Sequence, residues 1–372
     1  MDFSLACPNK SRYLIFFKID LKGAVKMNLS TSPRQSQITI NVDAVAKLIV
    51  ATQKSDGQIP WFPGDKTDPW DHVEAAMGLS IGGYLHEARN AFRWMKANQL
   101  PDGSWYASYQ DGEPLDKTRD TNFSAYLAVG VYHYYLVTGD QAFVREMWDT
   151  INAAITFALG QQAPGGEIYW ALNPEGVVDH MALLTGSSSV YMSIKCGLAI
   201  AKILGHRMAA WQQGFLKLEC ALRHKPHLFN MTKSRFSMDW FYPVLTGVLT
   251  GADARDRIAK YWKKFVVKGH GVRCVSDEPW ITLAETSELA LALAAAGNRD
   301  AAEIIFSWIS DKKFDDGSFW CGYTYPDMIT WPADKITWTN AVVLMAADAL
   351  FHLTPACQLF SHHFWASQDV MP

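Results

Sequence analysis

Acidic side chains recur at the starts of several predicted helices in this sequence. Four of them are the candidate catalytic carboxylates: Asp71, Asp120, Asp239 and Glu285. A pair of carboxyl groups can break a glycosidic bond, because one protonates the leaving oxygen while the other activates water or attacks the sugar. The acid member of such a pair needs a pKa that burial has raised. The four residues therefore indicate sugar chemistry, although the sequence does not assign the acid and the base.

Aromatic side chains lie between these acids, and most of the candidate substrate-binding residues belong to this type. Aromatic faces pack against sugar rings, and they also stabilise carbocations by cation–π attraction, so chemistry on an isoprenoid stays open. The chain holds 15 Trp and is 13% aromatic, a content that favours a binding role for some of these rings. The candidate binding residues are Trp61, Trp70, His72, Trp105, Tyr109, Asn122, Trp240, Trp280, Trp320 and Trp338.

Each candidate also has a structural interpretation. Asp at a helix start is a common N-cap, and an acidic residue in the first turn favours the helix dipole. Capping is the stronger interpretation for Asp68, whereas Asp71 is balanced between the two roles. Asp239 and Glu285 lie in otherwise apolar helical runs, which favours function slightly. His72 could brace a loop, and each Trp taken singly is better explained by packing.

A short repeat separates the helical segments. It ends a helix in Gln and continues through a Gly turn to an aromatic residue. Asp-Gly favours a turn because Asp caps its own backbone and Gly adopts positive φ. We predict that the Gln and the Trp tie the end of an outer helix to the following loop. Three instances run from Gln53 to Trp61, from Gln99 to Trp105 and from Gln162 to Trp170, and a fourth, Phe314 to Trp320, has the Asp-Gly turn without the Gln.

Between these turns the apolar residues follow a helical period. Helices that are apolar on nearly every side begin near Pro69, Thr121, Ser187, Met238, Thr282 and Thr337. Helices with one charged face cover 43–53, 86–98, 141–161, 207–223, 253–265 and 299–311. A helix that is apolar all round is buried, so the first set is expected inside the second. The pattern predicts an all-α (α/α)6 toroid of six helical hairpins, with long loops at one end. A linear helical solenoid competes, but it would need capping repeats.

The expected organisation is one catalytic domain with two flanking segments. Residues 1–40 are predicted to be a poorly ordered N-terminal segment, 41–355 the toroid, and 356–372 a C-terminal tail, with Met1 or Met27 as the start. The early residues do not match a signal peptide, and no stretch has the apolar length of a membrane span, so we expect a cytoplasmic protein. The oligomeric state stays open.

Composition limits the partners that we expect. The net charge of −3 gives no argument for binding nucleic acid or an acidic membrane surface. The six cysteines are scattered without a CxxC pair, so neither a zinc site nor a disulfide framework is predicted. We predict no cofactor and no metal. The expected partner is a small-molecule or oligosaccharide substrate.

The segment Thr118-Arg-Asp120-Thr-Asn122-Phe, followed by 134–148 with its Thr138-Gly139-Asp140 turn, resembles the six-hairpin glycosidases. Glucoamylase-like and debranching-type enzymes often carry such an Asp-containing inner helix and then Thr-Gly-Asp before an outer helix. The resemblance implies an (α/α)6 toroid whose carboxylates act at the loop-bearing end.

The Gln-x-x-Asp-Gly-x-Trp turns also resemble those of terpenoid cyclase and protein prenyltransferase toroids. The chain lacks an Asp-x-Asp-Asp acid motif, and Cys274 and Cys321 lack the setting of a zinc site. We therefore favour a carbohydrate-active enzyme, a glycoside hydrolase or a related sugar-modifying enzyme. The alternatives are an isoprenoid-directed cyclase or prenyltransferase and a non-catalytic binding toroid.

Overall fold

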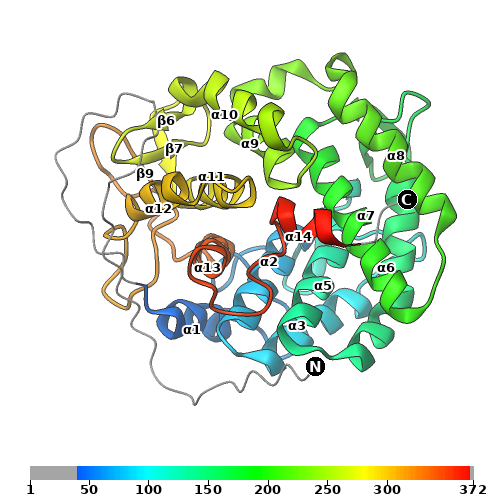
Figure 1. Cartoon of the computed structure of the whole chain (residues 1–372). Helices are drawn as coiled ribbons and strands as arrows, with labels where there is room; N and C mark the ends of the chain where they lie inside the picture. Colours follow the sequence, from blue (N-terminus) through cyan, green and yellow to red (C-terminus); the bar gives the residue numbers. More distant parts are fainter. Residues whose placement is uncertain (1–39, 369–372) are drawn as a thin grey trace, which may run out of the picture.

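The computed structural model describes residues 40–368, which are mainly helical (Figure 1). The predictions for residues 1–39 and 369–372, including the expected disorder of the N-terminal segment, lie outside the described residues. Among residues 40–368, no helix is both long enough and apolar enough to cross a membrane.

The helices alternate along the chain between an outer and an inner set (Figure 1). The outer helices are α1 (Val42–Thr52), α3 (Leu85–Ala97), α6 (Gln141–Gly160), α8 (Ala209–His224), α10 (Gly251–Phe265) and α12 (Arg299–Ser307). The inner helices are α2 (Pro69–Ile81), α4 (Thr121–Ala125) with α5 (Leu127–Thr138), α7 (Leu184–Leu204), α9 (Ser237–Leu245), α11 (Leu283–Ala295) and α13 (Thr337–Phe351). Helix α2 packs on α5, α5 on α7, α7 on α9, α9 on α11, α11 on α13, and α13 on α2 again. The inner helices thus follow one another in a closed cycle.

The burial of each set follows its sequence pattern. Nearly all of α11 is buried, whereas α10 buries only Ala254, Ile258 and Phe265 and turns its charged residues to solvent. An apolar stripe suffices for an outer helix because only one side meets the core. The predicted contrast between inner and outer helices is confirmed for these elements.

One predicted helix start is wrong by three residues. Helix α7 begins at Leu184, because Leu183 is the last extended residue before it. Ser187 and Ser188 therefore lie inside the first turns and do not cap the helix. The Ser188 hydroxyl donates to the Leu184 carbonyl four residues earlier, at 2.7 Å, which is a common use of serine within a helix.

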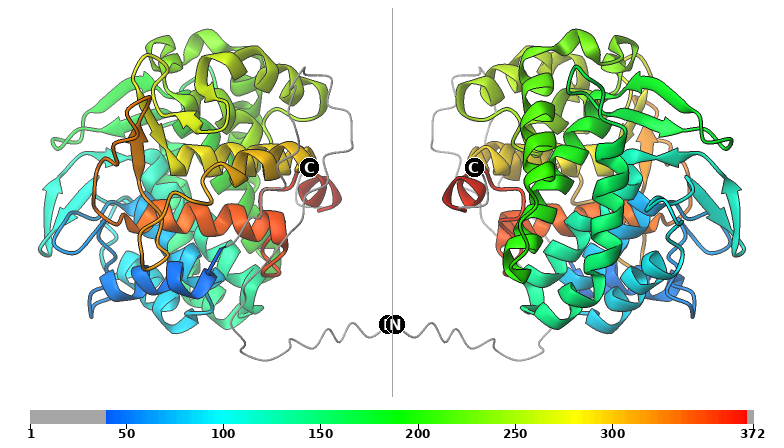
Figure 2. Two further views of the ribbon diagram at one scale, coloured as in Figure 1. Left: turned by 90° about the vertical axis from the view of Figure 1, so that its left-hand side faces the viewer. Right: turned by 90° about the vertical axis from the view of Figure 1, so that its right-hand side faces the viewer.

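Short antiparallel strands order the long loops. The first pair is β1 (Ser108–Gln110) with β2 (Glu113–Asp116), and the second sheet is β3 (Arg119–Asp120), β4 (Tyr169–Leu172) and β5 (Val178–Ala182). The third is β6 (Val266–Val267), β7 (Gly271–Arg273), β8 (Trp280–Thr282) and β9 (Gly322–Thr324). Two 3₁₀ turns, η1 (Pro226–Leu228) and η2 (Met231–Arg235), lie in the loop before α9. Figure 2 shows these strands at one end of the molecule and α14 (His362–Ser367) at the other.

Part of the predicted C-terminal tail is helical and packed. Trp365 of α14 is 8% exposed, and its ring lies 5.7 Å from that of Tyr132 on inner helix α5. The tail therefore covers the end of the helical cycle that lacks the strands (Figure 2).

The predicted glutamine ties are present in three of the four turns. In each, the side-chain amide donates to the carbonyl of the turn's own glycine and to a carbonyl of the next outer helix. For Gln99 these distances are 3.0 Å to Gly103 and 2.9 Å to Thr150 of α6. Gln53 and Gln162 make the equivalent pairs of bonds. Each tie fixes the start of a long loop to a neighbouring hairpin.

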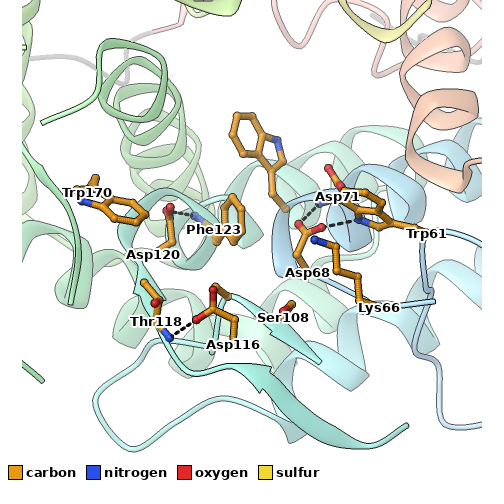
Figure 3. Close-up of a pocket in the computed structure, with 12 residues that line it drawn as sticks. Trp61, Lys66, Asp68, Asp71, Ser108, Asp116, Thr118, Asp120, Phe123 and Trp170 are labelled. Atoms are coloured by element: carbon orange, nitrogen blue, oxygen red, sulfur yellow. Dashed lines mark hydrogen bonds between the residues drawn. The ribbon is translucent and has the colours of Figure 1, made fainter. Parts of the chain in front are cut away.

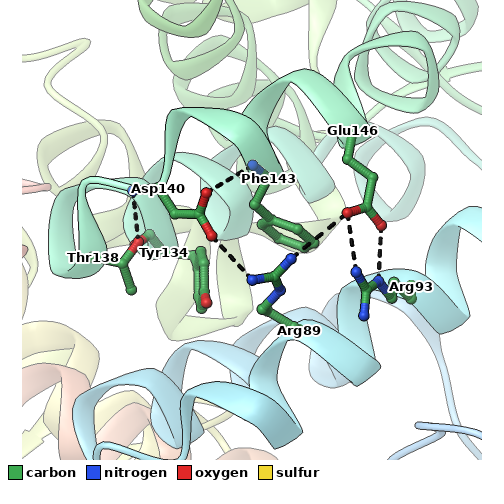
Figure 4. Close-up of polar contacts among 7 residues, drawn as sticks. All are labelled: Arg89, Arg93, Tyr134, Thr138, Asp140, Phe143 and Glu146. Carbon is green, nitrogen blue, oxygen red and sulfur yellow. Dashed lines mark hydrogen bonds and ion pairs between the residues drawn. The ribbon is translucent and has the colours of Figure 1, made fainter.

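The Thr-Gly-Asp turn that carries the family resemblance has a structural role (Figure 4). Gly139 ends α5 with a left-handed φ of 70°. The Thr138 hydroxyl accepts the Asp140 N–H at 3.1 Å, and Asp140 caps α6 by accepting the Phe143 N–H at 2.9 Å. The other Asp140 oxygen pairs with Arg89 of α3 at 3.1 Å. The motif therefore joins two hairpins at the end away from the strands.

We predict that Gly103→Ala destabilises the protein more than Gly112→Ala does. The two glycines have similar left-handed φ values of +91° and +86°, so an alanine costs backbone strain of about 1–2 kcal/mol at either position. Only at Gly103 would the added Cβ overlap the Ala153 carbonyl of α6, whereas Gly112 faces open space. Thermal unfolding midpoints measure the difference. Equal decreases would show that the close approach to α6 adds nothing.

Candidate active site

A cavity of about 300 Å³ opens at the strand-bearing end, beside the starts of α2 and α4 (Figure 3). It brings together two of the four predicted catalytic carboxylates, Asp71 and Asp120, which lie on either side of it. Its acidic lining is Asp68, Asp71, Asp116 and Asp120, and its aromatic lining is Trp61, Trp70, Phe123 and Trp170. Lys66 adds the one cationic side chain among the lining residues. This combination of acids and aromatic faces suits a sugar.

Asp68 orients the start of α2 and one wall of the cavity. One of its carboxylate oxygens accepts the Asp71 N–H at 3.0 Å as the helix N-cap, and the other accepts the Trp61 indole N–H at 2.7 Å. The capping interpretation of Asp68 is confirmed. The same carboxylate also places the Trp61 ring at the cavity (Figure 3).

Asp71 has the electrostatic setting of a general acid. Burial raises its pKa well above the usual range, and the negative charge of Asp68 and a hydrogen bond between the two carboxyls raise it further. Glu74 adds a smaller effect of the same sign. These effects favour the protonated form of the Asp71 carboxyl, which lies beside a cavity that a substrate can enter.

Asp120 caps α4 from the opposite side of the cavity. One carboxylate oxygen accepts the Asn122 and Phe123 N–H groups at 2.7 Å and 3.0 Å. Burial raises the pKa of Asp120 to about 7, although these two amide bonds oppose the rise. Asp120 therefore changes its protonation near neutral pH. The Asn122 side-chain oxygen is buried with no hydrogen-bond partner among the described residues.

Two further carboxyls were not among the predicted catalytic residues. Glu74 follows Asp71 by three positions on α2, and Glu288 follows Glu285 by three positions on α11, a spacing that puts both members on one helix face. Burial raises the pKa of Glu74 to about 8 and that of Glu288 well above its usual range. The charges of Glu74 and Glu285 raise the Glu288 pKa further, so these groups lie close together. The spacing of three was the signal available in the sequence.

Glu74 and Glu288 accept hydrogen bonds from two aromatic residues that pack together, one of which lines the cavity. The Trp70 indole N–H donates to Glu74 at 2.9 Å, and the Tyr242 hydroxyl donates to Glu288 at 2.7 Å. The Trp70 and Tyr242 rings meet edge to face, with centroids 5.8 Å apart. Glu74 thus positions the Trp70 ring that lines the cavity, and Glu288 positions the Tyr242 ring that packs against Trp70.

Glu285 lies in the first turn of α11, outside the residues that line the cavity itself. One of its carboxylate oxygens is buried with no hydrogen-bond partner among the described residues. A buried acceptor without a partner is costly, so such a group is a candidate for contact with a ligand. Burial raises the pKa of the Cys321 thiol, and the negative charges of Glu285 and Asp71 raise it further, so both carboxyls lie within electrostatic range of this thiol.

Asp239 has a structural environment. It accepts two hydrogen bonds from Thr185 of α7, at 3.2 Å from the backbone N–H and 2.6 Å from the hydroxyl. Burial raises its pKa, and the Thr185 bonds oppose that rise. Asp239 does not line the cavity. It joins α9 to α7, and its predicted catalytic role gains no support from this geometry.

Three predicted binding aromatics are buried in the protein. The Trp105 indole donates to the Met95 carbonyl at 2.8 Å, and the Trp240 indole donates to the Arg257 carbonyl at 3.0 Å. The Tyr109 hydroxyl accepts the Tyr106 N–H at 3.0 Å. None of the three lines the cavity, so their geometry favours packing over substrate binding.

His72 also has both ring nitrogens occupied by the backbone. Its Nδ1 accepts the Ile59 N–H at 3.1 Å, and its Nε2 lies 2.9 Å from the Ala91 carbonyl, which requires the proton on Nε2. Burial lowers the pKa of His72 to about 4, so the ring is neutral. The geometry matches the interpretation of His72 as a loop brace.

The remaining predicted aromatics extend away from the cavity. Trp338 packs edge to face on Trp61 with centroids 5.8 Å apart, and its indole N–H is buried without a partner among residues 40–368. The Trp280 indole donates to the Trp331 carbonyl at 2.9 Å, and Trp320 packs edge to face on Tyr323. Within the described part of the chain, no cluster of three or more His, Cys, Asp or Glu side chains could hold a metal ion.

Comparison with known proteins identifies the class of enzyme. No family model matches the chain. It is 46% identical over 315 residues to the MMP endo-(1,4)-3-O-methyl-α-D-mannosidase of Mycolicibacterium hassiacum, a match that covers 85% of this chain and 87% of that protein. This chain belongs to that mannosidase family. It is a glycoside hydrolase, as predicted from the carboxylates and the hairpin resemblance.

Solved structures share the fold. A wild-type glycosidase matches with a TM-score of 0.66 at 15% identity, over 84% of this chain and 96% of its own. The GH63 mannosylglycerate hydrolase of Thermus thermophilus, in complex with glucose, matches with a TM-score of 0.65 at 11% identity, over 82% and 99%. Of the two enzyme classes that the sequence left open, the 46% identity to the mannosidase favours the glycosidase.

We predict that Glu74→Gln flattens the pH dependence of stability. The Glu74 pKa is raised to about 8 in the folded protein, so the folded state binds more protons than the unfolded state between the ordinary value and pH 8. Stability therefore falls as the pH rises through this window. The variant loses less stability than the wild type as the pH rises. The stability of the variant relative to that of the wild type therefore increases toward pH 8. Thermal midpoints from pH 5 to 8 measure it, with the exposed Glu175→Gln as control. Parallel curves for the wild type and Glu74→Gln would contradict the prediction.

Proposed function

We propose that this glycoside hydrolase cleaves α-(1,4) bonds within chains of 3-O-methyl-D-mannose. The observation that carries the proposal is the 46% identity, over most of both chains, to a mannosidase whose name specifies that bond and that sugar. The cavity supports it independently, because carboxyl groups and aromatic faces meet there at the open end of the inner helices.

Asp71 is the general acid in this proposal. Its proton passes to the glycosidic oxygen as the bond to the anomeric carbon breaks, which leaves Asp71 ionised. Burial and the negative charge of Asp68 favour the protonated form of Asp71, as a proton donor requires. Asp68 acts as a positioning residue that also holds Trp61.

Glu285 is the opposing carboxylate in this proposal. Its buried unpartnered oxygen either takes a proton from the attacking water or attacks the anomeric carbon itself. The charges of Glu285 and Asp71 both raise the pKa of the Cys321 thiol, which supports their lying on the same side of the molecule. Asp120, across the cavity from Asp71, contacts the sugar through hydroxyl groups.

Aromatic rings of the cavity hold the sugar rings. Trp61, Trp70, Phe123 and Trp170 line it, and Trp338 packs behind Trp61. The buried Trp170 indole N–H has no partner among the described residues, which favours a bond to substrate. Trp280 of β8 and Trp320, two residues before β9, are not among the residues that line the cavity.

We also propose that the complete fold is the (α/α)6 toroid expected from the sequence, with residues 41–355 as its catalytic domain. The closed order of contacts among the inner helices and the alternation of tight turns with long loops support it. A cytoplasmic location stays a prediction.

Asp71→Asn and Glu285→Gln are expected to lower the hydrolysis rate by about 10²–10⁴-fold each, the usual contribution of general acid–base catalysis. The amides keep the shape of the side chains and remove the proton donor or the carboxylate. Release of reducing ends from 3-O-methylated α-(1,4)-mannan measures the rate, and thermal midpoints show whether folding is intact. Asp140→Asn is the control, because Asn caps a helix as well as Asp does and this cap lies at the opposite end. Wild-type rates in either variant would remove that residue from the mechanism.

Asp120→Asn is expected to fold normally and to lose the activity change that Asp120 causes near pH 7. Asn keeps the cap of α4. In the wild type the carboxyl loses its proton as the pH rises through about 7, so an accepting role makes activity rise across that range. Initial rates from pH 5.5 to 8.5 measure this rise in activity. If activity still rises near pH 7 in the Asp120→Asn variant, the pH dependence belongs to another group.

A further inference from the structure

Apolar side chains are exposed around the open end of the molecule. Among residues 40–368, eight large hydrophobic side chains are exposed, and only Leu85 and Leu216 belong to the outer helices. The other six belong to the loops, strands and 3₁₀ turns between the helices: Leu115, Val177, Met231, Met328, Ile329 and Trp331. Exposed apolar residues that gather on one face mark a binding surface.

The segment after β9 presents the most prominent of these side chains. Ile329 is 63% exposed and Trp331 is 59% exposed. The backbone beneath them is held in place, because the Trp331 N–H donates to the Gly322 carbonyl at 3.0 Å and the Thr324 N–H donates to the Ile329 carbonyl at 2.9 Å. Met328, between them and β9, adopts a left-handed φ of 58°, a conformation that costs a non-glycine residue free energy. The segment that exposes Ile329 and Trp331 therefore includes a backbone conformation that lowers the stability of the folded state.

The loop that carries Trp331 also reaches the wall of the cavity, and indole rings pack in pairs at both of its ends. Trp331 packs on Trp280 with centroids 5.1 Å apart, and its carbonyl accepts the Trp280 indole N–H. Farther along the same loop, the Thr337 N–H donates to the Trp61 carbonyl at 2.8 Å, and Trp338 packs on the Trp61 ring. Trp61 lines the cavity, so the loop that carries Trp331 is anchored to the cavity wall.

We propose that Ile329 and Trp331 form a distal subsite that binds 3-O-methyl groups of the substrate chain outside the cavity. The inference rests on the proposed function. A volume of about 300 Å³ is at the lower end for even a drug-sized ligand, so a polysaccharide must continue over the surrounding surface. Methylation replaces a hydroxyl donor by an apolar group, and an aromatic face beside an aliphatic side chain gains free energy by covering it.

The test measures binding and cleavage separately. Two α-(1,4)-mannooligosaccharides of equal length, one 3-O-methylated and one unmethylated, are titrated calorimetrically into the inactive Glu285→Gln protein and into the same protein with Trp331→Ala or Ile329→Ala. A methylated disaccharide, too short to leave the cavity, is the third ligand. Leu216→Ala is the matched control, because Leu216 is 47% exposed on the outer helix α8. Hydrolysis by the protein with an intact Glu285 is followed in parallel.

We expect Trp331→Ala to weaken binding of the long methylated ligand about tenfold, the effect of losing roughly one aromatic contact. Binding of the disaccharide and of the unmethylated chain, and the effect of Leu216→Ala, should change less than about twofold. Unchanged affinity of Trp331→Ala and Ile329→Ala for the long methylated ligand would overturn the subsite while hydrolysis by the wild type still supported the proposed function. Loss of wild-type hydrolysis and of all binding would overturn both. Light scattering that showed a dimer dissociated by Trp331→Ala would overturn the subsite by assigning the surface to a second copy of this chain.

Discussion

Burial of carboxyl groups in a poorly hydrated space is the constraint on which the site depends. Burial raises the pKa values of Asp71 and Glu74 on α2 and of Glu288 on α11. The negative charges of Asp68, Glu74 and Glu285 on their neighbours raise these pKa values further. These shifts favour the protonated form of each of the three carboxyls. Glu74 and Glu288 accept hydrogen bonds from Trp70 and Tyr242, whereas Asp71 lines the cavity that a substrate can enter.

The rest of the fold keeps those groups in place. The closed order of inner helices brings α2 and α11, which are more than 200 residues apart, to the same centre. The glutamine ties fasten three of the long loops to the next outer helix, and small sheets order the loops themselves. A carboxyl group held on a helix start by a cap and by packed neighbours needs little reorganisation when charge changes during the reaction.

Several residues acquired their roles only from their surroundings. Trp61 and Trp105 follow the same kind of turn in the sequence, yet Trp61 lines the cavity and Trp105 donates to a helix carbonyl in the core. Asp71 and Asp239 both occupy the first turn of an inner helix, but Asp239 is engaged by Thr185 of the neighbouring helix. Glu74 and Glu288 were not chosen as catalytic residues, because a carboxylate inside an apolar helix does not show which groups from other helices face it. The spacing of three showed that each shares a helix face with a candidate, and only packing showed that the two faces meet.

The sequence by itself determined the local structure: the helical hairpins, the Gln and Asp-Gly turns, the caps at Asp68 and Asp120, and the end of the molecule at which acids and indoles gather. These features depend on residues close together in the chain, where propensity, capping and periodicity act directly. The tertiary structure decided which carboxyls line the cavity and which indoles line it or are buried in the protein. It also decided which carboxyls have raised pKa values. Those outcomes depend on burial and on charges contributed by distant helices, because the pKa of a carboxyl is set by everything packed around it and not by its neighbours in sequence.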